Sequence, residues 1–365
     1  MPEQLRFGIV GCGVIAATHA QSIANLPDDA QLVAVADIVP ECAQKLAERY
    51  SANAYTSLQE MLARETLDIV NICTPSGLHG EQACAVMRSG RHVIVEKPME
   101  ISLAAIDEML RVQQEAGVKL AVISQHRFDA ASQQVSALVQ EQAFGRLVLG
   151  NMLVPWWRSQ GYYDSGAWRG TWALDGGGVL MNQSIHSIDL LQWLMGPVKS
   201  IYAYTDTLAH RMETEDVAVA VLRFANGALG TIAATTGAYP GIATRIELFG
   251  DRGSAVIEND VLAYLHLARD DKEAVGAYGV SASTQPQREI QETSDTPETG
   301  ETKGQSAASN PAALSSAGHT LQIADMIRAI RTGGTPLIDG IGGRYPVEII
   351  LGIYESARTH REVTL

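Results

Sequence analysis

Two side chains with acid–base capacity stand where a fold could aim them at a ligand. Lys97 follows the apolar run His92–Val95 (HVIV), and burial at the end of such a run favours the neutral amine. His186 lies in a helical stretch with Asn182 four residues before it and Asp189 three residues after it, so these share one helix face. An imidazole in such a polar stripe is a good catalytic candidate. A surface lysine and a buried, hydrogen-bonded histidine are the alternative interpretations.

A glycine turn follows the first apolar run, Leu5–Val10. Gly11 permits a tight turn, Gly13 permits close approach of a ligand, and the helix that follows offers free N–H groups to phosphate. Asp37 ends the next apolar run, where it can accept hydrogen bonds from ribose hydroxyls and would repel a 2′-phosphate. The pattern predicts a dinucleotide, NAD in preference to NADP, whereas a turn that binds nothing is the alternative. The expected contacts are Gly11, Gly13, Val14, Ile15, Asp37 and Ile38.

Further polar residues follow other apolar runs. Thr74, Pro75 and His79 come after Ile69–Ile72, at the sheet edge where ligands bind in open α/β folds. His79 could equally begin a helix with a satisfied ring. Aromatic and arginine side chains gather between residues 156 and 172, where they could form the wall of a carbohydrate or anionic substrate site or simply pack. We expect cofactor contacts also from Thr74, Pro75, His79, Glu96, Lys97, Trp168 and Arg169, and substrate contacts from Lys97, Arg127, Tyr163, Asn182 and His186.

Composition restricts the class of protein. The chain has 365 residues, 46% hydrophobic and 19% charged, which fits a globular protein of about two domains. Its net charge of −14 argues against nucleic acid or an anionic membrane as a partner. The four cysteines lack metal-site or redox spacing, so we expect reduced thiols and no bound metal. The N-terminus resembles a strand and turn, not a secretory signal, and no apolar run reaches about 18 residues, so we expect a cytoplasmic protein.

The elements that would hold these residues are of two kinds. Up to about residue 125, short apolar runs alternate with helical stretches, which predicts a doubly wound parallel sheet with helices on both faces. Later strands follow one another with tight turns at Asn226-Gly227 and Asp251–Gly253, which predicts an α+β region with an antiparallel sheet. The expected later helices are Val179–Met195, His319–Arg331 and Pro346–Thr359. We predict a dinucleotide-binding domain over 1–125, a substrate and oligomerisation domain over 126–345 with a polar, mobile loop at 281–316, and a C-terminal helix and tail over 346–365.

These segments together resemble one family. GCGVIA, Asp37, CTPSGLH, EKP, WRGTW, DGGGVLMNQSIHSIDLLQWLMG and VEIILGIYESART are similar to the glucose-fructose oxidoreductase / inositol dehydrogenase / rhizopine-catabolism (Gfo/Idh/MocA) family along nearly the whole chain. The resemblance implies an N-terminal Rossmann domain and a C-terminal α+β domain with an open, mostly antiparallel sheet through which members form dimers or tetramers. It implies catalysis by the EKP lysine, here Lys97, and by the helix histidine, here His186. One departure is Asn182, where similar inositol dehydrogenases have Asp, because an amide can orient a hydroxyl but cannot take a proton.

The residues and the resemblance predict a dehydrogenase. Hydride would pass to NAD from a secondary alcohol of a sugar, a polyol or a sugar derivative, nucleotide-activated sugars included. His186, helped by Lys97, would remove the hydroxyl proton. An enzyme that cleaves glycosidic bonds without net turnover of NAD and a non-enzymatic cofactor sensor are the alternatives. We expect a homodimer or homotetramer.

Overall fold

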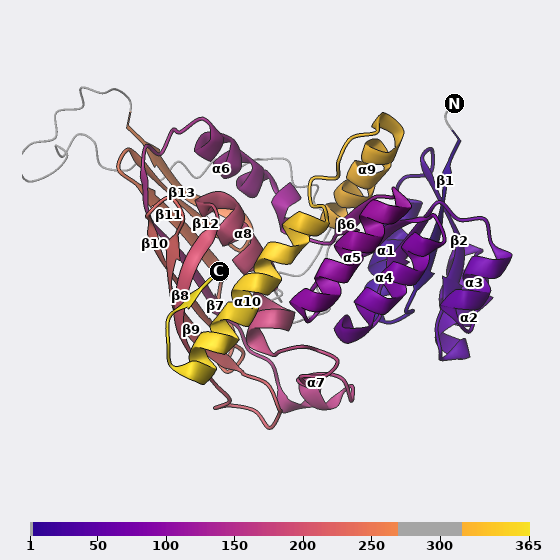
Figure 1. Cartoon of the computed structure of the whole chain (residues 1–365), viewed down its shortest axis with the longest axis horizontal. Helices are drawn as coiled ribbons and strands as arrows, with labels where there is room; N and C mark the ends of the chain where they lie inside the picture. The colour runs from indigo at the N-terminus through magenta and orange to yellow at the C-terminus, as the bar shows by residue number, and fades with distance from the viewer. Residues whose placement is uncertain (1–2, 269–315) are drawn as a thin grey trace, which may run out of the picture.

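The computed structural model describes residues 3–268 and 316–365, so the expected loop over 281–316 falls outside these ranges except for its last residue. Two sheets form the protein, and helix α10 (Gly340–Thr359) runs from one towards the other (Figure 1). Within the described ranges, no helix combines the length and the apolar character that a membrane span needs.

The first sheet is parallel and six-stranded, in the order β3-β2-β1-β4-β5-β6. Its strands are β1 (Leu5–Val10), β2 (Ala30–Ala36), β3 (Asn53–Tyr55), β4 (Ile69–Ile72), β5 (His92–Val95) and β6 (Leu120–Val122). Its helices are α1 (Val14–Ala24), α2 (Pro40–Tyr50), α3 (Leu58–Arg64), α4 (His79–Arg88) and α5 (Leu103–Ala116). The predicted Rossmann fold is confirmed, while the short β3 has no apolar signal in the sequence.

The near-continuous apolar runs arise because both faces of this sheet are covered. All four residues of β4 are buried. Ile69 belongs to the core cluster that contains Phe7, whereas Val70 belongs to the cluster that contains Leu58 of α3. Adjacent side chains of a strand point to opposite faces, so a strand between two helical layers has no polar side.

The second sheet is eight-stranded, in the order β13-β12-β11-β7-β10-β9-β8-β14. Only β7 and β10 pair in parallel; the other neighbours are antiparallel, as predicted. Its strands are β7 (Leu147–Pro155), β8 (Val198–Asp206), β9 (Val217–Phe224), β10 (Leu229–Thr235), β11 (Arg245–Gly250), β12 (Gly253–Glu258), β13 (Val261–Leu267) and β14 (Val363–Thr364). The helical pieces beside it are η2 (Gln125–Phe128), α6 (Ala130–Gln140), α7 (Gln160–Asp164) and α8 (Ile185–Met195).

One face of the second sheet is covered and the other is open. On the covered face, a Cβ added at Gly150 of β7 would lie 2.6 Å from the Met195 side chain of α8. The backbone N–H of Ala203 in β8 donates to Ser356 of α10 at 3.0 Å. From Ala218 onward the residues of β9 alternate between buried and exposed, and Val219 on the open face is 51% exposed.

Two predicted helices have different limits. The stretch Val179–Met195 is not one α-helix but a wide π-helical turn, Val179–Ser184, followed by α8. The N–H groups of Gly178 and Leu180 donate to the Glu215 carboxylate at 3.0 and 2.9 Å, so side-chain partners replace part of the helical ladder. The last helix, α10, begins well before Pro346, because Asp339 caps it by accepting from the Gly342 N–H at 2.8 Å.

The C-terminal helices contact both sheets. α9 (Ala317–Thr332) packs on α1, where the rings of His319 and His19 lie 5.3 Å apart. α10 approaches β6 so closely that a Cβ at Gly343 would lie 2.3 Å from Val122, and it also lies against β8 at Gly352. We propose that α9 completes the first domain, although it lies within the range expected for the second.

Candidate active site

Asp37 fixes the glycine turn between β1 and α1. Gly11 has a φ of +85°, and a Cβ there would lie 2.7 Å from the backbone of Cys73. The Asp37 carboxylate accepts from the N–H of Cys12 at 2.6 Å and from the N–H of Val39 at 2.8 Å. Each of its oxygens has a second lone pair that can accept a ribose hydroxyl.

The open space at Gly13 and the exposed apolar side chains beside the glycine turn fit a dinucleotide. A Cβ added at Gly13 would meet no atom within 4 Å, so the N-terminal N–H groups of α1 are open to an anion. Val14 is 74% exposed and Ile38 is 89% exposed, which leaves apolar surface for a flat base. Ile15 is partly buried in the same first turn of α1.

Lys97 reaches from the end of β5 to the π-helical turn of the second domain. Its Nζ donates to the backbone carbonyl of Asn182 at 2.8 Å. Burial lowers the pKa of Lys97, although the carboxylates of Glu96 and Asp175 oppose this. A lysine with a lowered pKa exchanges protons more easily at neutral pH.

His186 lies at the start of α8 and lines a small cavity of about 10 Å³, with room for about one water molecule, together with Lys97, Ser124 and Asp189. Burial lowers the pKa of His186 well below its usual range, and the positive charges of His126 and Lys97 lower it further. The neutral form of the imidazole is therefore favoured, and the same effect makes the ring a weaker proton acceptor. The two side chains proposed for catalysis come from different domains and face one cavity.

The Asn182 side chain holds the π-helical turn. Its Nδ2 donates to Asp175 at 2.5 Å, and its Oδ1 accepts from Gln183 Nε2 at 2.9 Å. The Asp175 carboxylate also accepts from the N–H of Gly170 at 2.9 Å. The sequence suggested that this amide orients a substrate hydroxyl. In the structure the amide anchors the turn, and the backbone carbonyl of the same residue binds Lys97.

Two arginines lie near Lys97. The guanidinium of Arg169 lies 4.5 Å from the ring centroids of both Tyr162 and Trp168, and its Nη1 donates to the Tyr162 hydroxyl at 2.8 Å. Arg158 lies 5.7 Å from the Tyr162 ring. The charges of both arginines act to lower the pKa of Lys97, although the carboxylates of Glu96 and Asp175 act on it more strongly in the opposite direction.

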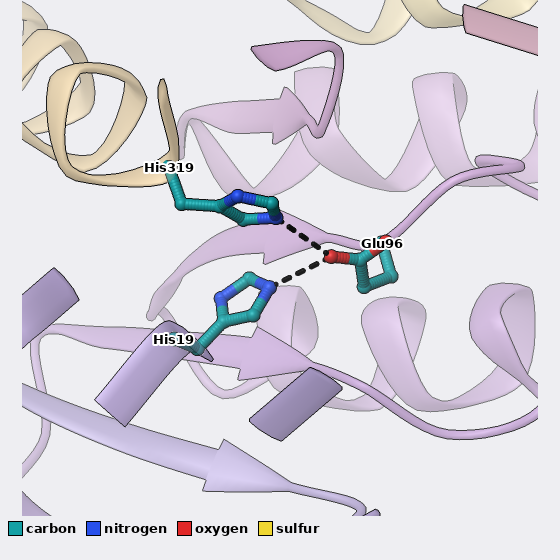
Figure 2. Close-up of side chains that lie close together, drawn as sticks. All are labelled: His19, Glu96 and His319. Carbon is teal, nitrogen blue, oxygen red and sulfur yellow. Dashed lines mark hydrogen bonds and ion pairs between the residues drawn. The ribbon is translucent and has the colours of Figure 1, made fainter. Parts of the chain in front are cut away.

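Glu96 directly precedes Lys97, and its buried carboxylate contacts two histidines. Its Oε1 accepts from His19 Nε2 at 2.8 Å and lies 3.4 Å from His319 Nε2 (Figure 2). Asn71 donates to Nδ1 of His19 at 2.8 Å, which leaves the ring hydrogen on Nε2 for the carboxylate. Burial would raise the pKa of Glu96, but the two histidines hold it well below its usual range. Its Oε2 accepts from the N–H of Lys97 at 3.1 Å, so Glu96 fixes this loop.

The loop after β4 contains three of the expected cofactor residues. The ring of His79 is buried, with Nδ1 2.8 Å from the Pro98 carbonyl oxygen and Nε2 2.8 Å from that of Thr74. Thr74 Oγ1 donates to Gln82 at 2.9 Å, and Pro75 precedes the 3₁₀ turn Ser76–Leu78. His79 thus ties this loop to the Lys97 loop, which is a positioning role.

Arg127 and Tyr163, expected to touch substrate, are held inside the protein. Arg127 forms a buried, two-pronged ion pair with Asp189, with N–O distances of 2.7 and 2.5 Å. Ser124 also hydrogen-bonds to this carboxylate. The Tyr163 hydroxyl pairs with the Thr236 hydroxyl at 2.8 Å. Asp189 therefore orders η2 against α8 and is not bonded to His186.

Several residues at the site were not found by sequence reasoning. The histidines at 19, 126 and 319 meet the site only because α9 folds back on α1 and η2 packs beside α8. No spacing rule connects such distant positions. Asp175 did carry a signal, because it directly precedes the three glycines at 176–178. Those glycines fit the close approach of protein atoms: a Cβ at Gly177 would lie 2.0 Å from the Tyr354 hydroxyl.

Comparisons with known proteins agree with this geometry. The model described as "Oxidoreductase family, NAD-binding Rossmann fold" matches residues 5–124, and that of the "GFO/IDH/MocA C-terminal domain" matches residues 132–256. The crystal structure of the WlbA dehydrogenase from Bordetella pertussis in complex with NADH and UDP-GlcNAcA is 34% identical, with a TM-score of 0.84 over 100% of this chain and 99% of that one. Myo-inositol 2-dehydrogenase from Thermotoga maritima is 28% identical over 270 residues, which cover 70% of this chain and 75% of that protein. Levoglucosan dehydrogenase from Pseudarthrobacter phenanthrenivorans is 25% identical over 288 residues, covering 70% and 73%.

The fold, the glycine turn and these matches define the class of protein. The chain belongs to the Gfo/Idh/MocA oxidoreductase family. It is an NAD-binding dehydrogenase that acts on CH–OH groups, so the predicted family, fold, cofactor and type of reaction are confirmed.

Proposed function

We propose that this protein oxidises a secondary alcohol of an anionic, nucleotide-activated sugar. The observation that carries the proposal is that Lys97 and His186 line the same small cavity, while the charges of Arg158 and Arg169 act on Lys97. The relative that is 34% identical along the full chain supports it, since its structure holds NADH and UDP-GlcNAcA.

The residues divide the chemistry as follows. The glycine turn at Gly11 and Gly13 and the Asp37 carboxylate would hold NAD, which would supply the hydride acceptor. The neutral His186 takes the hydroxyl proton, and general-base catalysis of this kind contributes about 10²- to 10⁴-fold to a rate. The amine of Lys97, held by the Asn182 carbonyl at 2.8 Å, donates a hydrogen bond to the developing oxyanion. The alcohol thus loses one hydride and one proton and becomes a carbonyl group.

The charge distribution supports an anionic substrate. The chain as a whole carries a net charge of −14, which repels anions at long range. Lys97, Arg158 and Arg169 oppose that field at one place. A guanidinium can bind a carboxylate or phosphate through two parallel hydrogen bonds. Neutral polyols can accept hydrogen bonds from these groups but gain no attraction between opposite charges.

A substrate panel tests the proposal. Purified protein with NAD is given UDP-GlcNAcA, UDP-GlcNAc, myo-inositol or levoglucosan, and NADH absorbance is followed. We expect the charged nucleotide sugars to have kcat/KM values at least about tenfold above those of the neutral compounds, which corresponds to one modest ionic contact. A preference for myo-inositol or levoglucosan would contradict the anionic assignment. Cleavage of a glycoside without NADH formation would indicate a redox glycosidase instead.

Two substitutions test the catalytic residues. Lys97→Met and His186→Gln should each lower kcat by about 10²-fold or more, while calorimetric NAD affinity stays close to that of the unmodified protein. Lys199→Met is a matched control, because Lys199 is exposed on β8. Near-normal turnover in both catalytic variants would show that another group moves the proton.

We further propose that the open face of the second sheet joins two copies of the chain. Tyr204, Val219 and Leu153 lie in one row across β8, β9, β10 and β7, and they are 62%, 51% and 42% exposed. Exposed apolar rows on a sheet are typical of association surfaces. Val219→Lys should lower the mass measured by light scattering from dimer or tetramer to monomer; an unchanged mass would exclude this face.

A further inference from the structure

His126 of η2 sits between two carboxylates and the candidate catalytic base. Its Nδ1 lies 2.8 Å from Asp129 Oδ2 and 3.1 Å from Asp260 Oδ1. On the other side, its ring meets His186 edge-on, with centroids 5.2 Å apart and an interplanar angle of 72°. Asp260 belongs to the β12–β13 turn, where it and Asn259 both have positive φ values, as this kind of tight hairpin requires.

The two carboxylates beside His126 favour a protonated ring. Its Nδ1 lies within hydrogen-bond distance of an oxygen of each, so it donates. Its Nε2 lies 3.3 Å from the side-chain amide of Gln125. Burial would lower the pKa of His126, but Asp129 and Asp260 raise it to about 10.

The other charges around His186 leave His126 as its main cationic neighbour on η2. Arg127 on the same element is neutralised by Asp189 of α8. The loop after β5 contributes Lys97 and the buried Glu96, and α9 contributes His319. Asp129 and Asp260, with 28% and 51% of their side chains exposed, are not among the groups whose charges act most on His186.

We propose that His126 is a positioning residue whose positive charge adds to the effect of burial and lowers the proton affinity of His186. The carboxylates of Asp129 and Asp260 maintain that charge, so the turn between β12 and β13 contributes to the active site without touching substrate. This inference rests on the proposed role of His186 as the base. It adds an electrostatic control that is set by residues distant in the sequence.

The protonation of His186 can be measured without any substrate. Long-range proton–nitrogen NMR spectra of the whole protein, recorded across a pH series, report the protonation of each imidazole ring. The His186 signals are identified because they disappear in His186→Gln. A unit charge at this distance corresponds to about one pH unit at an effective dielectric constant between protein and water. His126→Gln should therefore raise the His186 midpoint by about one unit. His126→Lys, which keeps the charge, should leave it within about a third of that shift.

A control variant at His266 and a variant at Asp260 test whether His126 controls the protonation of His186. His266→Gln replaces a partly buried histidine of β13 and should leave the His186 midpoint unchanged. Asp260→Asn, placed in a turn that tolerates asparagine, should lower the His126 midpoint by at least about half a unit even if the His126 variants fold poorly. Equal shifts in His126→Gln and His126→Lys, or no shift in either, would overturn the proposal. A shift caused by a chelator would overturn it too, by showing that a metal ion supplies the charge.

Turnover distinguishes this inference from the proposed function. If His186→Gln keeps full activity on the preferred substrate, the proposed base is wrong, whatever the NMR midpoints are. If His186→Gln is inactive and His126→Gln does not move the midpoint, the base is right and the control by His126 is wrong. When both hold, the acidic limb of the kcat/KM profile of His126→Gln moves to higher pH by the shift that NMR measures.

Discussion

Replacing Gly13 with alanine should weaken NAD binding and leave the free energy of unfolding almost unchanged. The φ of Gly13 is −75°, which any residue adopts, and the added Cβ meets no protein atom within 4 Å. The methyl group would instead occupy space beside the N-terminal N–H groups of α1. In a turn of this type, that is the space of the pyrophosphate.

The expected loss follows from the hydrogen bonds that the methyl group displaces. A hydrogen bond to a charged group contributes about 1.5–3 kcal/mol. Losing one between the backbone and the pyrophosphate therefore raises the Kd for NAD by roughly 10- to 150-fold. An isolated change of this size in Kd, with the melting temperature of the free protein within about 1 °C of the original, is the predicted signature.

Gly11→Ala provides the matched contrast. A left-handed φ of +85° costs a residue with a Cβ about 1–2 kcal/mol, and this Cβ would also lie 2.7 Å from the Cys73 backbone. The melting temperature should fall clearly. Isothermal titration calorimetry with NAD, and thermal unfolding without it, measure both variants. If Gly13→Ala bound NAD as tightly as the original protein, the pyrophosphate would not lie over this turn and our assignment of the cofactor site would be wrong.

Two further predictions concern buried charges. Asp189→Leu alone leaves the Arg127 guanidinium buried without its partner and should cost about 3–5 kcal/mol in chemical denaturation. Arg127→Met combined with Asp189→Leu should cost less, and costs that simply add would refute the coupling. Burial raises the pKa of Glu215 from 4.5 to about 7. Its folded pKa thus exceeds its unfolded one, so its stabilising contribution is complete below about pH 4.5 and is lost as the pH rises through about 7. Relative to Glu215→Gln, the unmodified protein should lose unfolding free energy over that interval, and parallel curves would contradict this.

Local signals in the sequence predicted those parts of the fold that depend on neighbouring residues. The turn at Gly11 and the hairpin at Asn226-Gly227 follow from conformations that few residue types adopt, since Gly11 has a φ of +85° and Gly227 a φ of +92°. The parallel sheet followed from apolar runs that are buried on both faces. The sequence could not show which distant residues meet. His126 gains its partner Asp260 only through the register of β12 and β13 and the packing of η2 beside them.

Asn182 shows why the site itself was harder to predict than the elements around it. From its type, we expected the side-chain amide to orient a substrate hydroxyl. That reasoning assumed a regular α-helix, in which backbone carbonyls are occupied and only side chains are available. The π-helical turn removes this assumption, because it lets the Asn182 carbonyl accept from Lys97 while the amide is bound to Asp175. In our proposal, asparagine in place of an acid is then no loss of a proton acceptor, since its amide serves the turn and His186 is the proposed base.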